Sequence, residues 1–211
     1  MLSRVAENLY WMARYIERAE NTARLIMVNS NLLLDLPKST QLGWEPIIDI
    51  LGSREQYLEQ NSDYDERTVL KFIIASPDCP TSILYSLRQA RENARTIRDI
   101  IPREAWERIN DTYQIARTMA PSGYSKKGRY AYLQNIILGA QTMTGLFAGT
   151  LLHDMGYDFL KMGRNLGRAD MTTRVLGVRA AALLAQPPGS VDEFAEVQWM
   201  GVLRSLSALQ M

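Results

Sequence analysis

Apolar residues recur at helical spacing along most of the chain. Near the amino terminus they follow one another at intervals of four and three residues, at Met12, Ile16, Ala19, Ala23 and Ile26. That spacing places them on one face of a long helix. No stretch alternates between apolar and polar residues for long enough to indicate a β-strand. The pattern therefore predicts an all-α protein, a helical bundle of roughly seven or eight helices.

Two more amphipathic helices are predicted in the middle of the chain. One apolar stripe extends to Ile101 after a start at Pro80–Thr81, and the next begins after Pro102, in a position where a first helical turn tolerates proline. Sequences rich in glycine, proline and small polar residues separate the predicted helices. They are DLPKST, SPDCP, APSGYSKKG and AQPPGS.

The first helix has a counterpart near the end of the chain. The sequence MARYIERAENTARLIMV, from Met12 to Val28, returns as MGRNLGRADMTTRVLGV, from Met162 to Val178. Matching helices usually share only the apolar positions that build a core, but here polar positions return as well. We call these two stretches the motif helices.

A shorter helix led by a tryptophan follows each motif helix, at Trp44 and at Trp199. Because neither short unit can bury its apolar face alone, we expect a single domain over residues 1–211. It would consist of two related units, 1–120 and 129–211, packed about a pseudo-two-fold axis.

The second unit is expected to be incomplete. The first unit continues after its tryptophan-led helix with the segment Cys79–Ala120, whereas the chain stops at Met211. The final helix should therefore expose an apolar strip, which would favour self-association or the binding of a partner. That strip would include some of Val202, Leu203, Leu206 and Leu209.

The composition bears on the cellular compartment and on the classes of partner that charge alone could attract. The chain is 46% hydrophobic and 22% charged, and its formal net charge is +1. No global charge therefore attracts nucleic acid or an anionic membrane. The single cysteine fits a reducing compartment, and the charged amino terminus lacks the apolar core of a secretory signal. These features predict a cytoplasmic protein.

One stretch, residues 130–152, contains no charged side chain and carries Gly145 and Gly149 in a G-x-x-x-G spacing. This pattern is typical of a membrane helix with a dimerisation face. However, several glutamine, asparagine and threonine residues lower its hydrophobicity. We therefore favour a helix buried in the bundle, whose two glycines allow close approach of a neighbouring backbone.

The polar positions that the motif helices carry form the candidate site. They are Arg14, Glu17, Arg18, Glu20, Asn21, Arg24, Arg164, Arg168, Asp170 and Arg174. One interpretation is a solvated helix face, on which i,i+4 ion pairs contribute ~0.2–0.5 kcal/mol each. A second is that the two faces meet, with Arg18 paired to Asp170 and Arg168 paired to Glu20. A third is a binding site for a carboxylate or phosphate with an amine nearby, such as an amino acid or a peptide end.

No catalytic residue, metal site or cofactor is predicted. His153 is the only histidine, so a histidine-based set of metal ligands cannot form within one chain. Cys79 has no neighbouring base, and we expect it to serve in packing. The sequence also contains neither a Walker loop nor a G-x-G-x-x-G motif.

The sequence resembles the bacterial alpha-E domain family along essentially its whole length. The resemblance rests on SRVAENLYWMARYIERAENTARL, HDMGYDFLKMGRNLGRADMTTRVL and QWMGVLRSLSALQM, and the run from Glu17 to Arg24 is specific. It implies an all-helical protein whose gene often lies beside circularly permuted ATP-grasp and transglutaminase-like genes, with a role in peptide or amide-bond metabolism. By this match the ten candidate residues carry the family motif. Gly167 stands where the family usually has a glutamate, so Glu17 has no twin in the second copy.

Two functions follow as alternatives. The first is a non-catalytic helical module that binds an ATP-grasp-like or transglutaminase-like partner, or presents a peptide to one. The second is an enzyme or small-ligand binder that uses an arginine–carboxylate layer between the motif helices. A solvated face at Arg14, Arg18, Arg164 and Arg168 would favour the partner surface, and a concave, partly buried face would favour the ligand.

Overall fold

All regular secondary structure in the described residues is helical, which confirms the predicted fold class. The computed structural model of the protein describes residues 1–35, 37, 43–184 and 194–209. These residues form nine helices, more than predicted, because a five-residue helix carries too short a pattern to be recognised. The helices are α1 (Ser3–Asp35), α2 (Glu45–Leu51), α3 (Arg54–Leu58), α4 (Glu66–Ala75), α5 (Ile83–Thr96), α6 (Arg103–Gly123), α7 (Lys126–Thr150), α8 (Met155–Leu184) and α9 (Ala195–Ser205).

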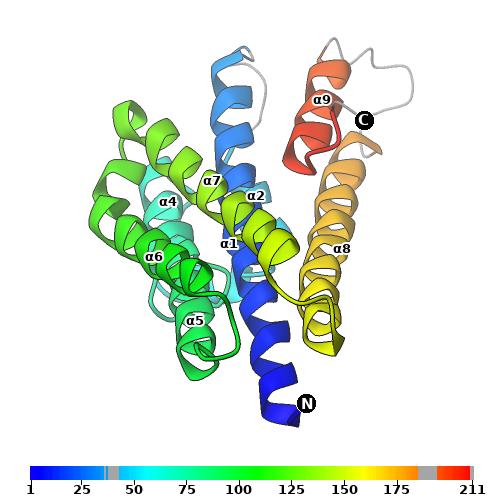
Figure 1. Ribbon diagram of the computed structural model, residues 1–211. Coiled ribbons are helices and arrows are strands. Elements are labelled where there is room, and N and C mark those ends of the chain that lie inside the picture. Colours follow the sequence, from blue (N-terminus) through cyan, green and yellow to red (C-terminus); the bar gives the residue numbers. More distant parts are fainter. Residues whose placement is uncertain (36, 38–42, 185–193, 210–211) are drawn as a thin grey trace.

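Helix α1 passes through the centre of the molecule. It packs against α2, α5, α7, α8 and α9, and Figure 1 shows α4, α5 and α6 on one side of it, α7 crossing in front of it, and α8 and α9 on the other side. Because neighbours cover several sides of α1, it buries polar residues as well as its apolar stripe. Glu17, Glu20, Thr22 and Asn29 are all buried.

Polar caps fix where several helices begin. The Asp65 carboxylate accepts hydrogen bonds from the backbone N–H groups of Arg67 and Thr68, and the Ser82 hydroxyl accepts one from Tyr85. The Ser125 hydroxyl accepts one in the same way at the start of α7. Each cap satisfies backbone donors that lack a partner inside the helix. Pro102, as predicted, stands immediately before a helix, α6.

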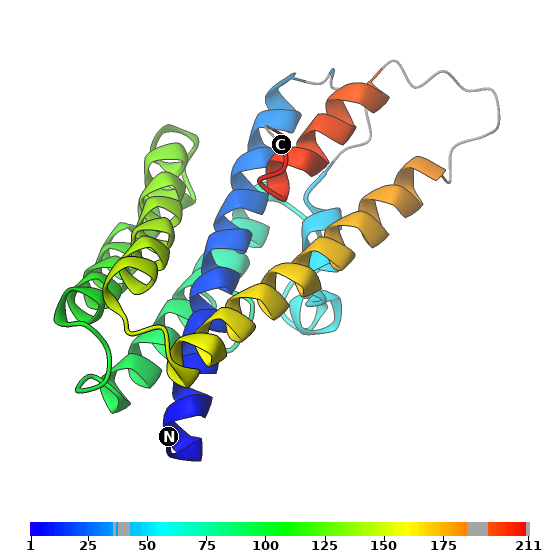
Figure 2. The same ribbon diagram turned by 45° about the vertical axis from the view of Figure 1, so that its right-hand side comes forward.

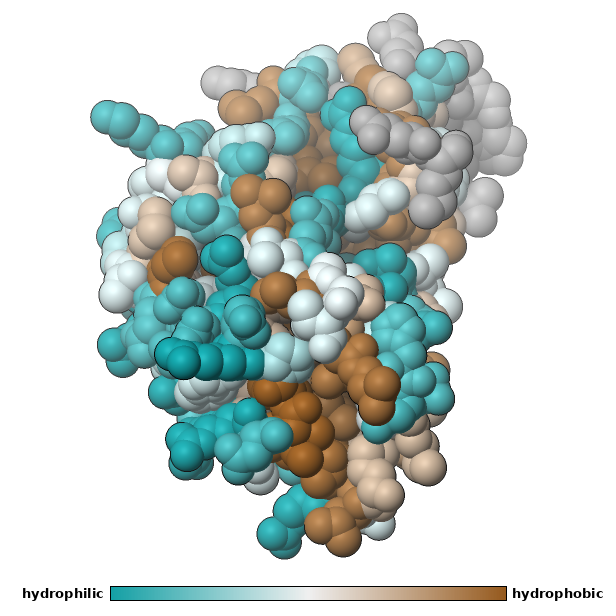
Figure 3. Space-filling model, viewed as in Figure 1, coloured by the Kyte–Doolittle hydropathy of each residue, from teal (hydrophilic) through white to brown (hydrophobic). Residues whose placement is uncertain are grey.

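Two large clusters of buried apolar side chains hold the bundle together, beside a small one at Val28 and Leu32. The larger surrounds the carboxyl half of α1 and includes Ile26, Ile47 and Tyr57. The smaller surrounds its amino half and includes Met12 and Met143. Figure 3 shows that apolar residues also lie on the surface near the beginning of α1, where Leu2 is exposed.

Our expectation for the two glycines of α7 was wrong. Gly145 and Gly149 are exposed, and a Cβ at either position would meet no atom within 4 Å. The close approach is at Gly139, where a Cβ would lie 2.7 Å from Thr112 Oγ1 of α6. The buried stripe of α7 passes through Met143, and the two later glycines fall outside it. Among the described residues, none of the helices has the length and hydropathy needed to cross a membrane.

Part of the predicted apolar strip on the last helix is present. Leu203 and Leu209 are exposed, together with Met200. Val202 is buried in the larger cluster. The two tryptophans also differ in their surroundings, since Trp44 precedes α2 and is buried, whereas Trp199 lies inside α9 and is 41% exposed. The predicted AQPPGS turn, residues 185–190, lies outside the described residues, as does most of DLPKST.

The turn between α6 and α7 falls inside the predicted boundary at residues 120–128. The motif helices, now α1 and α8, pack against each other and run in the same direction, and α9 lies beside the far ends of both (Figures 1 and 2). A two-fold relation between units 1–120 and 129–211 stays a prediction.

Candidate functional site

The two motif helices touch at a glycine. A Cβ placed on Gly163 of α8 would collide with the backbone carbonyl of Tyr10 in α1, lying 3.0 Å from the carbonyl carbon. Backbone atoms cannot give way as the end of a flexible side chain can. Gly163 therefore allows α8 to approach α1 closely enough for the charged residues of the two helices to reach one another.

The strongest link across this contact joins Glu17 and Arg168. Arg168 Nε and Nη2 donate to the two carboxylate oxygens of Glu17 at 2.9 and 3.4 Å. The Glu17 side chain is 2% exposed, whereas that of Arg168 is 51% exposed. The hydrogen bond to Glu17 raises the pKa of Arg168. This fork geometry holds a buried carboxylate on α1 with a guanidinium that reaches in from the surface of α8.

Gly167 leaves the space that Glu17 uses. A Cβ at position 167 would lie 3.3 Å from Glu17 Cγ, so a longer side chain there would press on it. Asn21, one turn further along α1, donates to Glu17 Oε1 at 3.4 Å. Glu17 thus has partners from both motif helices, although it has no twin in the second copy.

A second group of charges links Arg14, Asp170 and Arg174. Arg14 Nη2 lies 3.6 Å from Asp170 Oδ2, and Arg174 Nε donates to Asp170 Oδ1 at 2.8 Å. The Arg174 guanidinium also reaches the carboxyl end of α2, because a Cβ on Gly52 would be 2.7 Å from its Nη1. A cation in that position is favourable, since a helix ends in unpaired carbonyl groups.

Glu20 pairs along its own helix with Arg24, whose Nη2 donates to Glu20 Oε1 at 2.6 Å. Glu20 is buried, and this burial raises its pKa, with the hydrogen bond from Arg24 acting in the opposite direction. The expected i,i+4 pair is therefore present, but it is not the solvated pair that the first interpretation describes.

The faces meet, as in the second interpretation, but both of the pairs named in that interpretation are wrong. Arg168 pairs with Glu17 in place of Glu20, and Asp170 pairs with Arg14 in place of Arg18. In both cases the partner on α1 lies one turn nearer the amino terminus. The helices are parallel, and the two copies of the motif are offset by 150 residues. Glu17 and Arg168, which are 151 residues apart, therefore lie at nearly equivalent positions, whereas Arg14 and Asp170 are six residues out of register.

The remaining candidate arginines are partly buried. Arg18 Nη1 donates to the backbone carbonyl of Pro80 at 3.3 Å, and burial lowers the pKa of Arg18. Arg164 lies beside Glu17 and Met143, and its Nε is buried without a hydrogen-bond partner in the described part of the chain. Arg14 Nε is likewise buried without a hydrogen-bond partner among the described residues.

There is little free space within this charged layer. One cavity beside Arg164 and another beside Arg18 each have a volume of ≈ 20 Å³. Such a cavity holds about one water molecule. The layer is therefore partly buried, yet its own side chains fill it. It is neither the solvated face expected of a partner surface nor the concave face expected of a ligand site.

Sequence reasoning missed the aromatic residues that accompany these arginines. The guanidinium of Arg14 lies 5.9 Å from the ring centroid of Trp11, and that of Arg18 lies 5.3 Å from the ring of Tyr15. On α5, Arg88 lies 5.2 Å from the ring of Tyr85 in the same way. We call these six residues the arginine–aromatic ladder: Trp11, Arg14, Tyr15, Arg18, Tyr85 and Arg88.

The aromatic rings of the ladder form a continuous row from α1 to α5. The ring centroids of Trp11 and Tyr15 are 5.7 Å apart, and those of Tyr15 and Tyr85 are 6.4 Å apart. Burial raises the pKa of Tyr15, and the nearby Tyr85 contributes. The signal was present in the sequence as three aromatic-x-x-Arg pairs, because side chains three residues apart meet on a helix surface.

Other residues considered from the sequence have local roles. His153 Nε2 lies 2.9 Å from the Ala148 carbonyl oxygen, and its ring stacks on Tyr157. Cys79 is buried, with its sulfur 3.1 Å from Thr81 Oγ1. Among the described residues, no group of three or more histidine, cysteine, aspartate or glutamate side chains could hold a metal ion.

Comparisons with known proteins place the chain in a family of bacterial sequences. It is 24% identical over 191 residues to Uncharacterized protein Rv2567 of Mycobacterium tuberculosis and to Uncharacterized protein Mb2597 of Mycobacterium bovis. Each match covers 82% of this chain and 22% of the relative, so the chain spans about a fifth of the length of these proteins. No solved structure matches it significantly.

One family model matches the whole chain, residues 1–211. Its description is "A predicted alpha-helical domain with a conserved ER motif". The all-helical fold agrees with that description, and Glu17, which Arg18 follows in the chain, lies at the contact between the motif helices. The protein therefore belongs to the Alpha-E family.

Proposed function

We propose that this domain is a non-catalytic helical module that docks onto an ATP-grasp-like or transglutaminase-like protein, or presents a peptide to one. The arginine–aromatic ladder is the surface that would make the contact. The proposed partner would act in peptide or amide-bond metabolism, and the module would position that partner or its substrate without taking part in the reaction.

The observation that carries this proposal is the composition of the ladder. Tryptophan, tyrosine and arginine are the residue types that contribute most binding energy at protein interfaces. In the ladder they alternate over α1 and α5, and Trp11 is 37% exposed. Each guanidinium already lies against a ring, so less side-chain entropy is lost when a partner binds.

The charged layer supports the same proposal. Glu17, Glu20 and Asp170 each have an arginine partner within 3 Å, and the adjacent cavities have volumes of ≈ 20 Å³. A substrate would have to displace these internal partners. The layer is therefore better suited to fixing α8 against α1, which sets the geometry of the neighbouring ladder.

The length of the relatives is also consistent with a module. The matched region is 22% of each mycobacterial protein, so in those proteins a domain similar to this one accompanies a much longer polypeptide. A helical domain that works with other domains or with a separate partner fits such an arrangement.

The alternative function is a small-ligand binder or an enzyme that uses the arginine–carboxylate layer. The buried Nε atoms of Arg14 and Arg164, which lack partners among the described residues, favour it. Calorimetry with amino acids, short peptides and ATP would test this alternative. Saturable binding that is lost in Arg168→Ala and retained in Trp11→Ala would support the layer as the site and contradict our proposal.

The docking proposal is tested with a purified ATP-grasp-like protein and a purified transglutaminase-like protein from the same organism. We expect calorimetry to detect a complex with one of them, and Trp11→Ala or Tyr85→Ala to weaken it by about 10-fold or more. Trp199→Ala is the matched control, because Trp199 is similarly exposed but lies on α9. If neither protein binds, or if only Trp199→Ala weakens the complex, the ladder is not the docking surface.

Self-association through α9 is a separate expectation, based on the exposed Met200 and Leu203 of that helix and on Leu209, which follows it. Sedimentation of the free protein over a range of concentrations tests it. A dimer that dissociates in Leu203→Asp would support this expectation. A monomer at all concentrations would contradict it and would leave the ladder as the proposed surface.

A further inference from the structure

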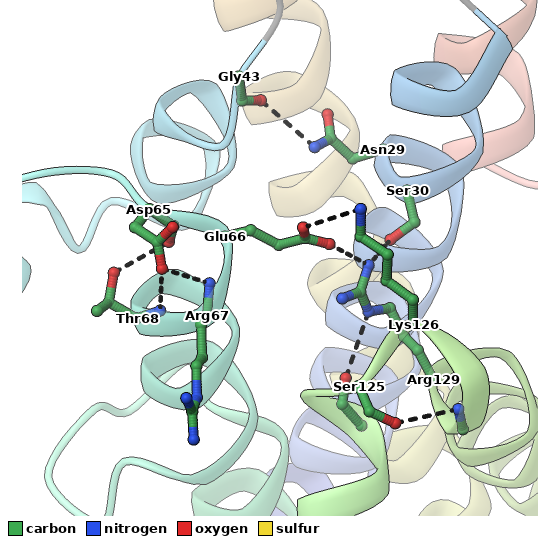
Figure 4. A network of polar contacts seen from close by, with 12 residues as sticks. Asn29, Ser30, Gly43, Asp65, Glu66, Arg67, Thr68, Ser125, Lys126 and Arg129 are labelled. Atoms are coloured by element: carbon green, nitrogen blue, oxygen red, sulfur yellow. Dashed lines mark hydrogen bonds and ion pairs between the residues drawn. The ribbon is translucent and has the colours of Figure 1, made fainter.

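A larger cavity lies on another part of the molecule, away from the charged layer. It is bounded by the carboxyl half of α1, the beginning of α4 and the beginning of α7, and its volume is ≈ 200 Å³. Figure 4 shows how Glu66 of α4 reaches toward Arg129 and Lys126 of α7, with Ser30 of α1 on the other side of Arg129.

Arg129 is the buried cation of this cavity, with a side chain that is 7% exposed. Its Nη1 lies 2.7 Å from Glu66 Oε1 and donates to Ser30 Oγ at 3.2 Å, and its Nε donates to the Gly123 carbonyl oxygen at 3.3 Å. The guanidinium lies 5.6 Å from the ring centroid of Trp44. Its Nη2 is buried and has no hydrogen-bond acceptor among the described residues.

The charges at the mouth of this cavity are not balanced. Lys126 Nζ lies 3.8 Å from Glu66 Oε2, so two cations share one carboxylate. The Lys126 side chain is 77% exposed and is free to turn toward a ligand. Removing a guanidinium from water is costly unless its charge and its N–H groups are both satisfied. An additional anion beside Lys126 and Arg129 would supply the missing negative charge.

The walls of the cavity are largely apolar. Trp44 and Leu133 are buried at its base. Leu34 and Tyr130 stand at its rim and are 76% and 58% exposed. Single exposed apolar side chains need no explanation, but here two of them stand around one cavity that also carries an excess of positive charge. A ligand that combines an anion with an apolar body would satisfy both features.

We propose that this cavity binds a small monocarboxylate with an aromatic or branched aliphatic body. The carboxylate pairs with Lys126 and lies in the field of Arg129, and the body packs against Trp44, Leu34 and Tyr130. A cavity of about 150 Å³ holds a benzene molecule, so ≈ 200 Å³ suits a phenyl group on a short chain. This site is separate from the ladder and does not depend on the proposed function.

The charge requirement is tested with three probes of the same shape. We expect calorimetry to show that 3-phenylpropionate binds, with a Kd of about 1 mM or below. The uncharged 3-phenylpropanol should bind about 5-fold more weakly, and 3-phenylpropylammonium should bind most weakly of the three. Equal binding of the carboxylate and the alcohol, or no binding of the carboxylate at about 10 mM, would overturn the proposal.

The role of Lys126 is tested with its neighbour as the control. Lys126→Gln should weaken binding of 3-phenylpropionate by about 5-fold. Lys127→Gln should leave binding unchanged, because Lys127 is also exposed on the first turn of α7 but does not line the cavity. Both lysines are on the surface, so both variants should fold, and circular dichroism verifies this. Equal effects of the two substitutions would show that only general surface charge is involved.

The position of the ligand is tested with the indole N–H signals of the protein. The sequence contains four tryptophans, so a ¹H–¹⁵N spectrum resolves one indole signal from each, and Trp44→Phe identifies that of Trp44. Titration with 3-phenylpropionate should shift the Trp44 signal, while those of Trp11, Trp106 and Trp199 stay in place. A shift confined to any of the other three would place the ligand elsewhere and contradict the assignment.

Discussion

Gly163 of α8 lies directly against Tyr10 of α1. A Cβ on Gly163 would be 3.0 Å from the Tyr10 carbonyl carbon and 3.2 Å from its Cα, and it would be closer still to the carbonyl oxygen. All three atoms belong to the backbone of a buried helix interface. The smallest possible side chain at position 163 therefore sets how closely the motif helices approach each other.

Gly163→Ala should consequently destabilise the fold, although alanine is the better helix former. The added methyl group has to push the helices apart, and we expect a loss of about 2–3 kcal/mol in the free energy of unfolding. Gly177→Ala is the matched control on the same helix, because a Cβ there meets no atom within 4 Å. That substitution should stabilise the protein by about 0.5–1 kcal/mol. Denaturant titrations that gave the same sign for both would contradict this account of the contact.

The Glu17–Arg168 pair gives a second prediction. Arg168→Ala leaves the carboxylate of Glu17 buried with only the weak hydrogen bond from Asn21. Because Arg168 itself is half exposed, we expect a loss of about 1–3 kcal/mol, which lies between the values for surface and buried pairs.

Arg103→Ala is the control for this prediction, since the Arg103–Glu107 pair is exposed on both sides. It should leave the free energy of unfolding unchanged within the error of a denaturant titration, because solvent screens an exposed pair. If Arg168→Ala and Arg103→Ala have equal stability, the Glu17–Arg168 pair contributes no more to the fold than an exposed ion pair does.

Helical periodicity was sufficient to predict the fold class, but it left the meeting of the motif faces as one of three interpretations. Periodicity could not predict which residues pair. If α8 slides along α1 by one helical turn, Asp170 meets Arg14 and not Arg18, although every residue stays on the same face of its helix. That shift depends on Gly163 and on its contact with the Tyr10 backbone, and the sequence does not show which glycine is at a contact. The same uncertainty explains the error at Gly145.

The ladder and the larger cavity were not predicted for a different reason. Both depend on helices that are distant in sequence, since Tyr15 meets Tyr85 and Arg129 meets Glu66. Periodicity within one helix indicates which side chains share a face, but not which other helix will cover that face. The aromatic-x-x-Arg pairs were visible in the sequence, and their alignment across α1 and α5 was not.

Glu20 gives a prediction for the dependence of stability on pH. Burial raises the pKa of Glu20 in the folded protein above its ordinary value of 4.5. The folded state then holds this proton more tightly than the unfolded chain, so the contribution of Glu20 to stability falls as the pH rises from 4.5 through the raised pKa.

Glu20→Gln removes this titration. We expect the free energy of unfolding of the variant, relative to that of the unaltered protein, to increase as the pH rises from about 4 to about 7. Denaturant titrations of both proteins across this range measure the difference. A difference that decreases with pH would mean that the pairing with Arg24 outweighs burial and lowers the pKa of Glu20.

Two buried tyrosines provide a last prediction, because the hydroxyl group of one is hydrogen-bonded within the described residues and that of the other is not. The Tyr132 hydroxyl has no hydrogen-bond partner among the described residues, and burial raises its pKa. The Tyr57 hydroxyl donates to the Asp63 carbonyl oxygen at 2.7 Å and lies 2.9 Å from Thr68 Oγ1. An unsatisfied buried hydroxyl costs stability, whereas a satisfied one contributes to it. Tyr132→Phe should therefore stabilise the protein by about 1 kcal/mol, and Tyr57→Phe should destabilise it by about 1–2 kcal/mol. Thermal and denaturant unfolding of the two variants measures both effects, and a loss of stability in Tyr132→Phe would show that a bound water satisfies its hydroxyl.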